Sequence, residues 1–88
     1  MKIRLESGEE AEAQAFDGNV LNLWSPRAFA PGSPIRFVAT VNDEERSLEG
    51  RAIASKRIDD SHFEVRMRLV NLRRGDRELL LTQIADRH

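Results

Sequence analysis

Hydrophobic and polar residues alternate along most of this chain with a period of two. The clearest run is HFEVRMRLV at 62–70, which places Phe63, Val65, Met67 and Leu69 on one face and Glu64, Arg66 and Arg68 on the other. Successive side chains of a β-strand point to opposite faces of the sheet. This run therefore predicts a strand that buries one face in the core.

Five further segments have the same pattern, with turn residues between them. They predict strands at 2–6, 10–16, 20–24, 35–41 and 46–58. In the second, strict alternation after the turn Ser7-Gly8 favours a strand, with Ala11, Ala13 and Ala15 on one face and Phe16 on the other, although alanine and glutamate also favour helix.

Two of these strands leave a question about which side chains point inward. In VLNLW at 20–24, the inward pair is either Leu21 and Leu23 or Val20 and Trp24. In 46–58, the apolar pattern changes phase, so we expect Leu48 and later Ile53 and Ala54 inward, with a β-bulge near Gly50.

A longer period marks the C-terminal end of the chain. Leu80, Leu81, Ile84 and Ala85 recur as they would on one side of a helix, which predicts a helix over about 76–86. Asp76 is the expected N-cap, and Gly75 would allow the chain to reverse direction just before it.

Many short strands joined by tight turns favour a sheet that closes on itself, because closure removes the exposed edges. A chain of 88 residues has room for one small core. We therefore expect a single domain over residues 1–88, mainly β, built as a six-stranded antiparallel β-barrel with a C-terminal α-helix.

Composition limits the classes of function. The formal net charge is −1, so no global field attracts nucleic acid, and the absence of cysteine excludes thiolate metal sites. No apolar run approaches the roughly 20 residues that span a bilayer. We expect a cytoplasmic protein with no membrane insertion, no cofactor and no metal.

Catalytic motifs are also missing from the sequence. It contains no nucleophile elbow, P-loop or G-x-G-x-x-G, and a hydrolytic triad would have to use His62 or His88. The chain is therefore not expected to be an enzyme.

Two groups of residues are candidates for binding instead. Trp24, Arg27 and Phe29 border or belong to the proline-rich loop 25–34 and could anchor a protein partner, although Trp24 and Phe29 could equally be core residues. An alternative anion site would use the arginines of the last strand and the helix. These are Arg66, Arg68, Arg73 and Arg77.

Three segments together resemble the PilZ domain over roughly residues 11–85: AFAPGSPIRFVATV, LEGRAIAS and HFEVRMRLVNLRRGDRELLLTQI. PilZ domains are six-stranded antiparallel barrels with a C-terminal helix, and many bind cyclic di-GMP. They do so through an R-x-x-x-R ahead of the barrel strands and a D/N-x-S-x-x-G after the second strand.

Both binding motifs are degenerate in this chain. The first region reads MKIRLES, with Arg4 alone. In the second, a register starting at Asp17 puts Asn19 and Asn22 at the serine and glycine positions, and a register ending at Gly18 puts Ala13 and Ala15 at the polar ones.

The resemblance, with these departures, implies a small bacterial regulatory module that acts through protein contacts without the usual cyclic di-GMP binding. Motility, polarity or pilus-related control would be its setting. Two alternatives stay open: a nucleotide sensor that uses the arginine site, and a barrel that binds single-stranded nucleic acid. The sequence does not identify the partner or the oligomeric state.

Overall fold

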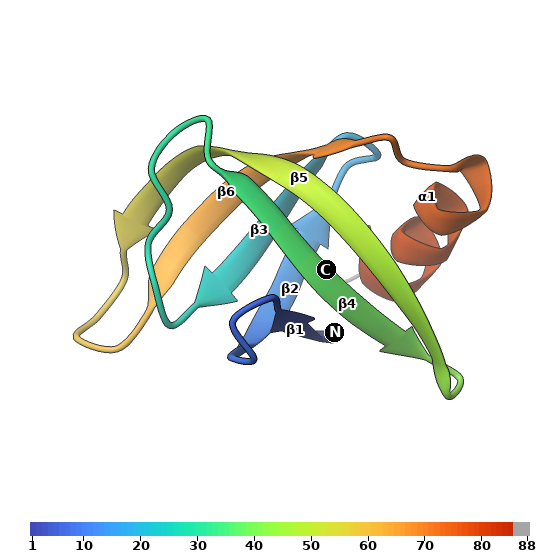
Figure 1. Ribbon diagram of the computed structural model, residues 1–88, viewed down its shortest axis with the longest axis horizontal. Helices are drawn as coiled ribbons and strands as arrows, with labels where there is room; N and C mark the ends of the chain where they lie inside the picture. The colour runs from blue at the N-terminus through green and yellow to red at the C-terminus, as the bar shows by residue number, and fades with distance from the viewer. Residues whose placement is uncertain (86–88) are drawn as a thin grey trace.

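The computed structural model describes residues 1–85 and contains six β-strands followed by a helical segment (Figure 1). The strands are β1 (Lys2–Leu5), β2 (Glu10–Phe16), β3 (Val20–Ser25), β4 (Pro34–Val41), β5 (Glu44–Arg57) and β6 (Phe63–Val70). The α-helix α1 (Arg74–Leu80) continues directly into a π-helical turn, η1 (Leu81–Ala85).

The strands form a closed barrel in the order β1-β2-β3-β6-β5-β4, and each pair is antiparallel. The short strand β1 closes the barrel, since it pairs with β2 on one side and with β4 on the other. The predicted six-stranded antiparallel barrel with a C-terminal helix is confirmed. None of the helices within residues 1–85 is long and apolar enough to cross a membrane.

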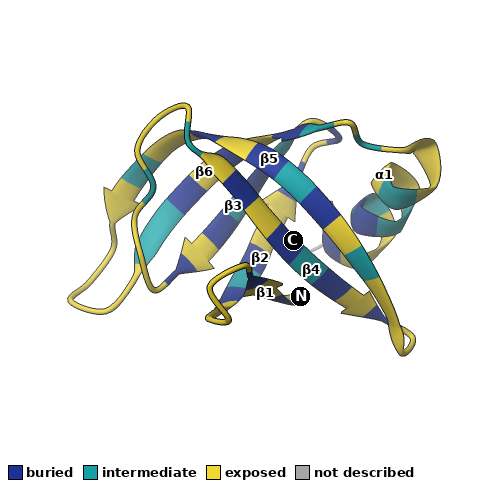
Figure 2. Ribbon diagram, in the orientation of Figure 1, coloured by how far each residue is buried: buried dark blue, intermediate teal, exposed yellow. Residues whose placement is uncertain are grey.

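Buried and exposed residues alternate along the strands (Figure 2), and the buried apolar residues form the core of the barrel. Leu21 and Leu23 are fully buried and Trp24 is 46% exposed, which decides the orientation of β3 in favour of the two leucines. The inward residues of β6 are also as predicted, with Val65 and Met67 fully buried.

Two β-bulges change the side-chain pattern where strict alternation was expected. In β2 the register shifts between Ala13 and Ala15, so Phe16 instead of Ala15 shares the buried face with Ala11 and Ala13, and the predicted division of faces is wrong for these two residues. In β5 the shift lies between Ala52 and Ala54 rather than near Gly50, and the extra residue, Ile53, is 36% exposed.

Ile53 and Ala54 were both expected to point inward, and both are exposed because of this bulge, while Ala52 is buried. Gly50 remains in register opposite Leu69. A Cβ at Gly50 would lie 2.6 Å from the Met67 Sδ and 2.9 Å from the Arg68 carbonyl oxygen. The glycine is therefore explained by close packing in the barrel.

The helix begins earlier than predicted, at Arg74, with Arg73 in the N-cap position and no side-chain cap. The prediction of Asp76 as the N-cap is wrong: Asp76 lies in the first turn and accepts a hydrogen bond from Arg46. The Leu80 and Ile84 side chains are buried in the core cluster. The predicted last residue, 86, lies outside the described residues, as does the Ala85 side chain.

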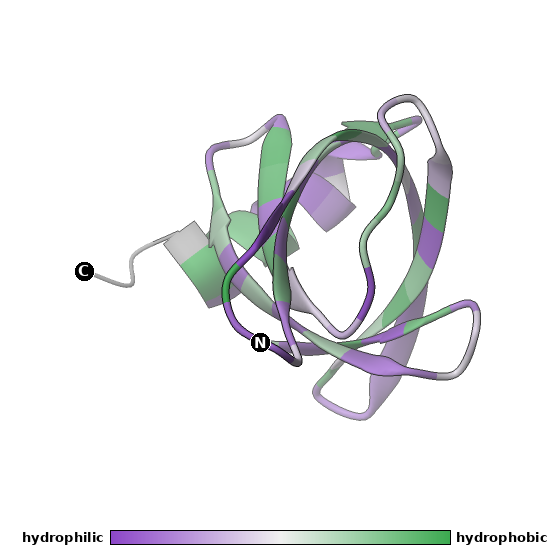
Figure 3. Cartoon of the chain, turned by 90° about the vertical axis from the view of Figure 1, so that its left-hand side faces the viewer, coloured by the Kyte–Doolittle hydropathy of each residue, from purple (hydrophilic) through white to green (hydrophobic). Residues whose placement is uncertain are grey.

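The helical segment lies at one end of the barrel, where η1 packs against β2. Figure 3, a view along the barrel, shows the helix behind the far opening. Leu80 and Ile84 thus join the barrel core from that end, so the helix completes the core instead of forming a separate layer.

Candidate functional site

Trp24 projects from the outer face of β3 and is the largest exposed apolar side chain in the described part of the chain. Its cross-strand neighbours are Glu12 on β2 and Glu64 on β6, both half-buried. The indole borders a surface hollow of about 200 Å³, which Pro26 and His62 also line. Such an exposed aromatic ring on a rigid strand is available for contact with another molecule.

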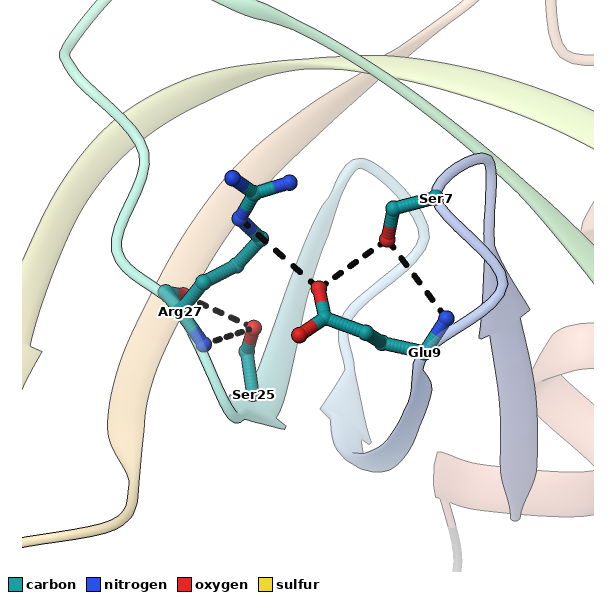
Figure 4. A network of polar contacts seen from close by, with 4 residues as sticks. All are labelled: Ser7, Glu9, Ser25 and Arg27. Atoms are coloured by element: carbon teal, nitrogen blue, oxygen red, sulfur yellow. Dashed lines mark hydrogen bonds and ion pairs between the residues drawn. The ribbon is translucent and has the colours of Figure 1, made fainter.

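Arg27 connects the proline-rich loop to the turn between β1 and β2 (Figure 4). Its Nε lies 3.8 Å from the Glu9 Oε1, which also accepts a 3.0 Å hydrogen bond from the Ser7 hydroxyl. The buried Ser25 hydroxyl accepts from the Arg27 N–H and donates to the Arg27 carbonyl, at 3.1 and 2.8 Å. These contacts fix the start of the loop directly after Trp24.

Phe29 is half-buried and packs against the core cluster. Its N–H donates to the Ser55 Oγ and its carbonyl accepts from the same hydroxyl, both at 2.9 Å. The Arg27 guanidinium lies 5.9 Å from the centre of its ring. Of the three residues expected to anchor a partner, Trp24 is thus the exposed aromatic one, and Arg27 and Phe29 hold the loop in place.

Arg66 and Arg68 point outward from β6, and both are exposed. Arg68 is the cross-strand partner of Arg51 on β5, and Arg66 lies diagonally across from Trp24, whose direct partner is Glu64. We call the surface formed by Trp24, Arg51, Arg66 and Arg68 the Trp–Arg face.

The arginines of the Trp–Arg face lack the ion pairs that four other arginines of the described residues make. Within residues 1–85, no carboxylate lies within 4 Å of the guanidinium of Arg51, Arg66 or Arg68; Arg51 instead donates to the Gly32 carbonyl at 3.1 Å. Elsewhere four arginines have such a partner: Arg4 with Glu45, Arg27 with Glu9, Arg36 with Glu6, and Arg46 with Glu44 and Asp76.

Asn22 lies between Trp24 and the arginines, with Arg66 as its cross-strand partner. Its Oδ1 is shielded from solvent and accepts no hydrogen bond from the described residues. A shielded amide oxygen without a hydrogen-bond donor costs free energy in the folded protein.

Asp17 and Asn19, the other two residues of the degenerate motif, stabilise the turn between β2 and β3. The Asp17 carboxylate accepts hydrogen bonds from the N–H groups of Asn19 and Val20, at 2.9 and 2.8 Å. These backbone donors, Val20 first, hold the pKa of Asp17 below its usual value. The Asn19 carbonyl accepts from the Leu69 N–H, which ties the same turn to β6.

The structure places the four arginines of the alternative anion site on two different elements. Arg66 and Arg68 lie on β6, whereas Arg73 and Arg77 lie at the start of the helix, where the Arg77 N–H donates to the Arg73 carbonyl. Arg73 lines a hollow of about 560 Å³ that also contains Glu45 and Glu49. This hollow, which was not predictable from sequence, is lined by both carboxylates and guanidinium groups, with no excess of the latter.

The polar groups in residues 1–85 include no cluster of three histidine, aspartate or glutamate side chains arranged to hold a metal ion. The His62 Nδ1 lies 3.2 Å from the Asp59 Oδ1 in an exposed turn. A hydrogen bond from the Ser61 N–H, more than this contact, lowers the pKa of Asp59. This pair is explained by turn structure.

Comparison of the chain with protein-family models, with curated protein sequences and with solved structures finds no match.

Proposed function

We propose that this chain is a docking module: a small barrel that recognises another protein through the Trp–Arg face. The observation that carries the proposal is the exposure of Trp24 on a closed, well-packed barrel. Tryptophan and arginine are enriched among the residues that dominate binding energy in protein interfaces. The Trp–Arg face contains one tryptophan and three arginines.

The position of Trp24 within the fold supports this role. Trp24 lies near the end of β3. The next residue, Ser25, is fully buried, and its hydroxyl both donates a hydrogen bond to the Arg27 carbonyl and accepts one from the Arg27 N–H. A side chain held on a strand between two fixed neighbours loses little further freedom when it is covered by a partner. The exposed Ile53 on β5 adds apolar surface to the same side of the sheet.

The resemblance to PilZ domains gives this proposal a biological setting. The chain would be a degenerate PilZ-like regulator in the bacterial cytoplasm, engaged in motility, polarity or pilus-related control. The usual cyclic di-GMP contacts are not expected in it: Arg4 is 3.5 Å from Glu45, and the Asp17 carboxylate accepts hydrogen bonds from its own turn.

The docking proposal is tested by capturing binding proteins from a lysate of the organism that encodes the chain. The wild type is compared with Trp24→Ala and with Ile58→Ala, which removes an exposed apolar side chain outside the Trp–Arg face. We expect Trp24→Ala to lose the bound protein and Ile58→Ala to keep it. Equal capture by all three folded proteins would refute the proposal.

A nucleotide sensor is the second candidate, because the guanidinium groups of Arg66 and Arg68 have no carboxylate partner in the described part of the chain. Arginine binds phosphate well through paired N–H donors. Calorimetric titration with cyclic di-GMP separates the candidates: binding at micromolar concentration or tighter, lost in Arg66→Glu, would favour the sensor.

A further inference from the structure

Within residues 1–85, the guanidinium groups of Arg51, Arg66 and Arg68 on the Trp–Arg face have no carboxylate within 4 Å. Arg51 and Arg68 are direct cross-strand partners, and Arg66 follows on the same face of β6. Like charges placed directly opposite each other across two strands destabilise a sheet. Within residues 1–85 no ion pair offsets this repulsion, although five carboxylates pair with arginines elsewhere on the structure.

The charge on this side of the sheet also varies along the strands. The rung that contains Trp24 is mixed: Glu64 on β6 lies opposite Lys56 on β5, and Glu12 on β2 pairs with the Met1 ammonium group at 2.6 Å. The rung at the other end has Arg68 and Arg51. Between them lies the rung of Asn22 and Arg66, with its unpaired amide oxygen. A ligand that lies along β6 therefore meets an aromatic ring in a rung of mixed charge first, and guanidinium groups afterwards.

We infer that the partner presents a segment of mixed character to this face: an apolar side chain for Trp24, followed by carboxylates for Arg66, Arg68 and Arg51. Guanidinium groups pair with carboxylates through two parallel hydrogen bonds, and such pairs would neutralise the Arg51–Arg68 repulsion. The inference rests on the proposed docking role and adds the chemistry of the partner to it.

The same charge pattern argues against a single-stranded nucleic acid. A nucleic acid carries a phosphate at every nucleotide, so bases stacked on Trp24 would bring phosphates close to Glu64 as well as to its other neighbour, Lys56. A peptide has no such constraint, because it can place a neutral or basic residue beside Glu64. The net charge of −1 likewise provides no long-range attraction for a polyanion.

The test is selection of random-sequence peptides displayed on phage against the immobilised protein. Four proteins are compared: the wild type, Arg66→Glu/Arg68→Glu, Trp24→Ala, and Arg74→Glu/Arg77→Glu as a control with the same change in charge on the exposed surface of α1. Circular dichroism and thermal unfolding establish that each variant is folded before selection.

The wild type and the helix control should select peptides enriched in aspartate and glutamate next to an apolar residue. Affinity for a selected synthetic peptide should fall about tenfold or more in Arg66→Glu/Arg68→Glu, because charge-assisted hydrogen bonds are lost and repulsion replaces them. That variant should in turn select peptides richer in lysine and arginine.

Two results would overturn the inference. The first is selection of peptides without acidic enrichment, or the same acidic enrichment with Arg66→Glu/Arg68→Glu. If Trp24→Ala still abolished selection, this result would refute only the acidic character of the partner and would leave docking intact. Peptide selection unchanged in Trp24→Ala would refute docking itself. As a separate arm, quenching of the fluorescence of Trp24, the single tryptophan, by oligothymidylate with a steep salt dependence would instead assign the face to nucleic acid.

Discussion

The Arg46 guanidinium donates a hydrogen bond of 2.8 Å to the Asp76 carboxylate and so joins β5 to the first turn of α1. The Asp76 side chain is only 13% exposed, and Arg46 also lies 3.4 Å from Glu44. The bond to Asp76, more than the contact with Glu44, raises the pKa of Arg46 above its ordinary value. This pair fixes how the helix begins over the end of the barrel.

Asp76→Ala should therefore lower the urea midpoint of unfolding, because Arg46 loses its best partner and the start of the helix loses a favourable negative charge. Glu78→Ala, an exposed position on the same helix, is the control and should have less effect. The difference between the variants should shrink in high salt. Equal midpoints at low salt would show that the pair does not anchor the helix.

Asp76 also shows the limit of sequence reasoning about this helix. Its position after Gly75 suited an N-cap, but the helix starts two residues earlier, and the carboxylate pairs with an arginine thirty residues away in the chain. That partner depends on how the helix packs on the barrel, which local preferences do not encode. The apolar stripe was more reliable, since Leu80 and Ile84 are buried as expected.

The strands were predictable because one face of each is buried, so apolar and polar residues alternate along the sequence. The errors occur at the bulges, where one extra residue changes which side chains point inward: Ala15, Phe16, Ile53 and Ala54 were misassigned for this reason. Apolar residues on both faces of β3 left the orientation of Trp24 undecided until pairing with β2 and β6 fixed it. The same register determines that, within residues 1–85, no carboxylate lies within 4 Å of the guanidinium of Arg66 or Arg68.

Gly50 provides a test of barrel packing. Gly50→Ala should destabilise the protein by about 1–3 kcal/mol, because the new methyl group meets the Arg68 carbonyl as well as the flexible Met67 side chain. The matched control is Gly75→Ala in α1, where no atom lies within 4 Å of the new Cβ. Alanine favours helix there by up to about 1 kcal/mol over glycine, so the control should be neutral or stabilising in urea denaturation.

Leu80 tests whether the helix is part of the core. Its side chain is fully buried against the end of the barrel, so Leu80→Ala should cost about 2–5 kcal/mol in the free energy of unfolding. Thr82→Ala, on the exposed side of η1, should change stability little. A loss below about 1 kcal/mol for Leu80→Ala would mean that the barrel folds without support from the helix.

Asp17 should make stability depend on pH. Its pKa is lower in the folded protein than its ordinary value of 3.8, so the charged form favours folding at neutral pH. This contribution is complete above 3.8 and is lost as the pH falls through the lower, folded pKa. Asp17→Ala should therefore be less stable than the wild type in urea at pH 7, and the two midpoints should converge in acid.

The most direct test of docking uses the single tryptophan. Incorporation of 5-fluorotryptophan gives one fluorine resonance, at Trp24, whose shift and width can be followed while lysate from the source organism is added. The account predicts that the resonance shifts or broadens in the wild type and that Arg66→Glu/Arg68→Glu reduces the effect. Docking at the Trp–Arg face would be contradicted if the resonance did not change in either protein at lysate concentrations at which the wild type captures a partner.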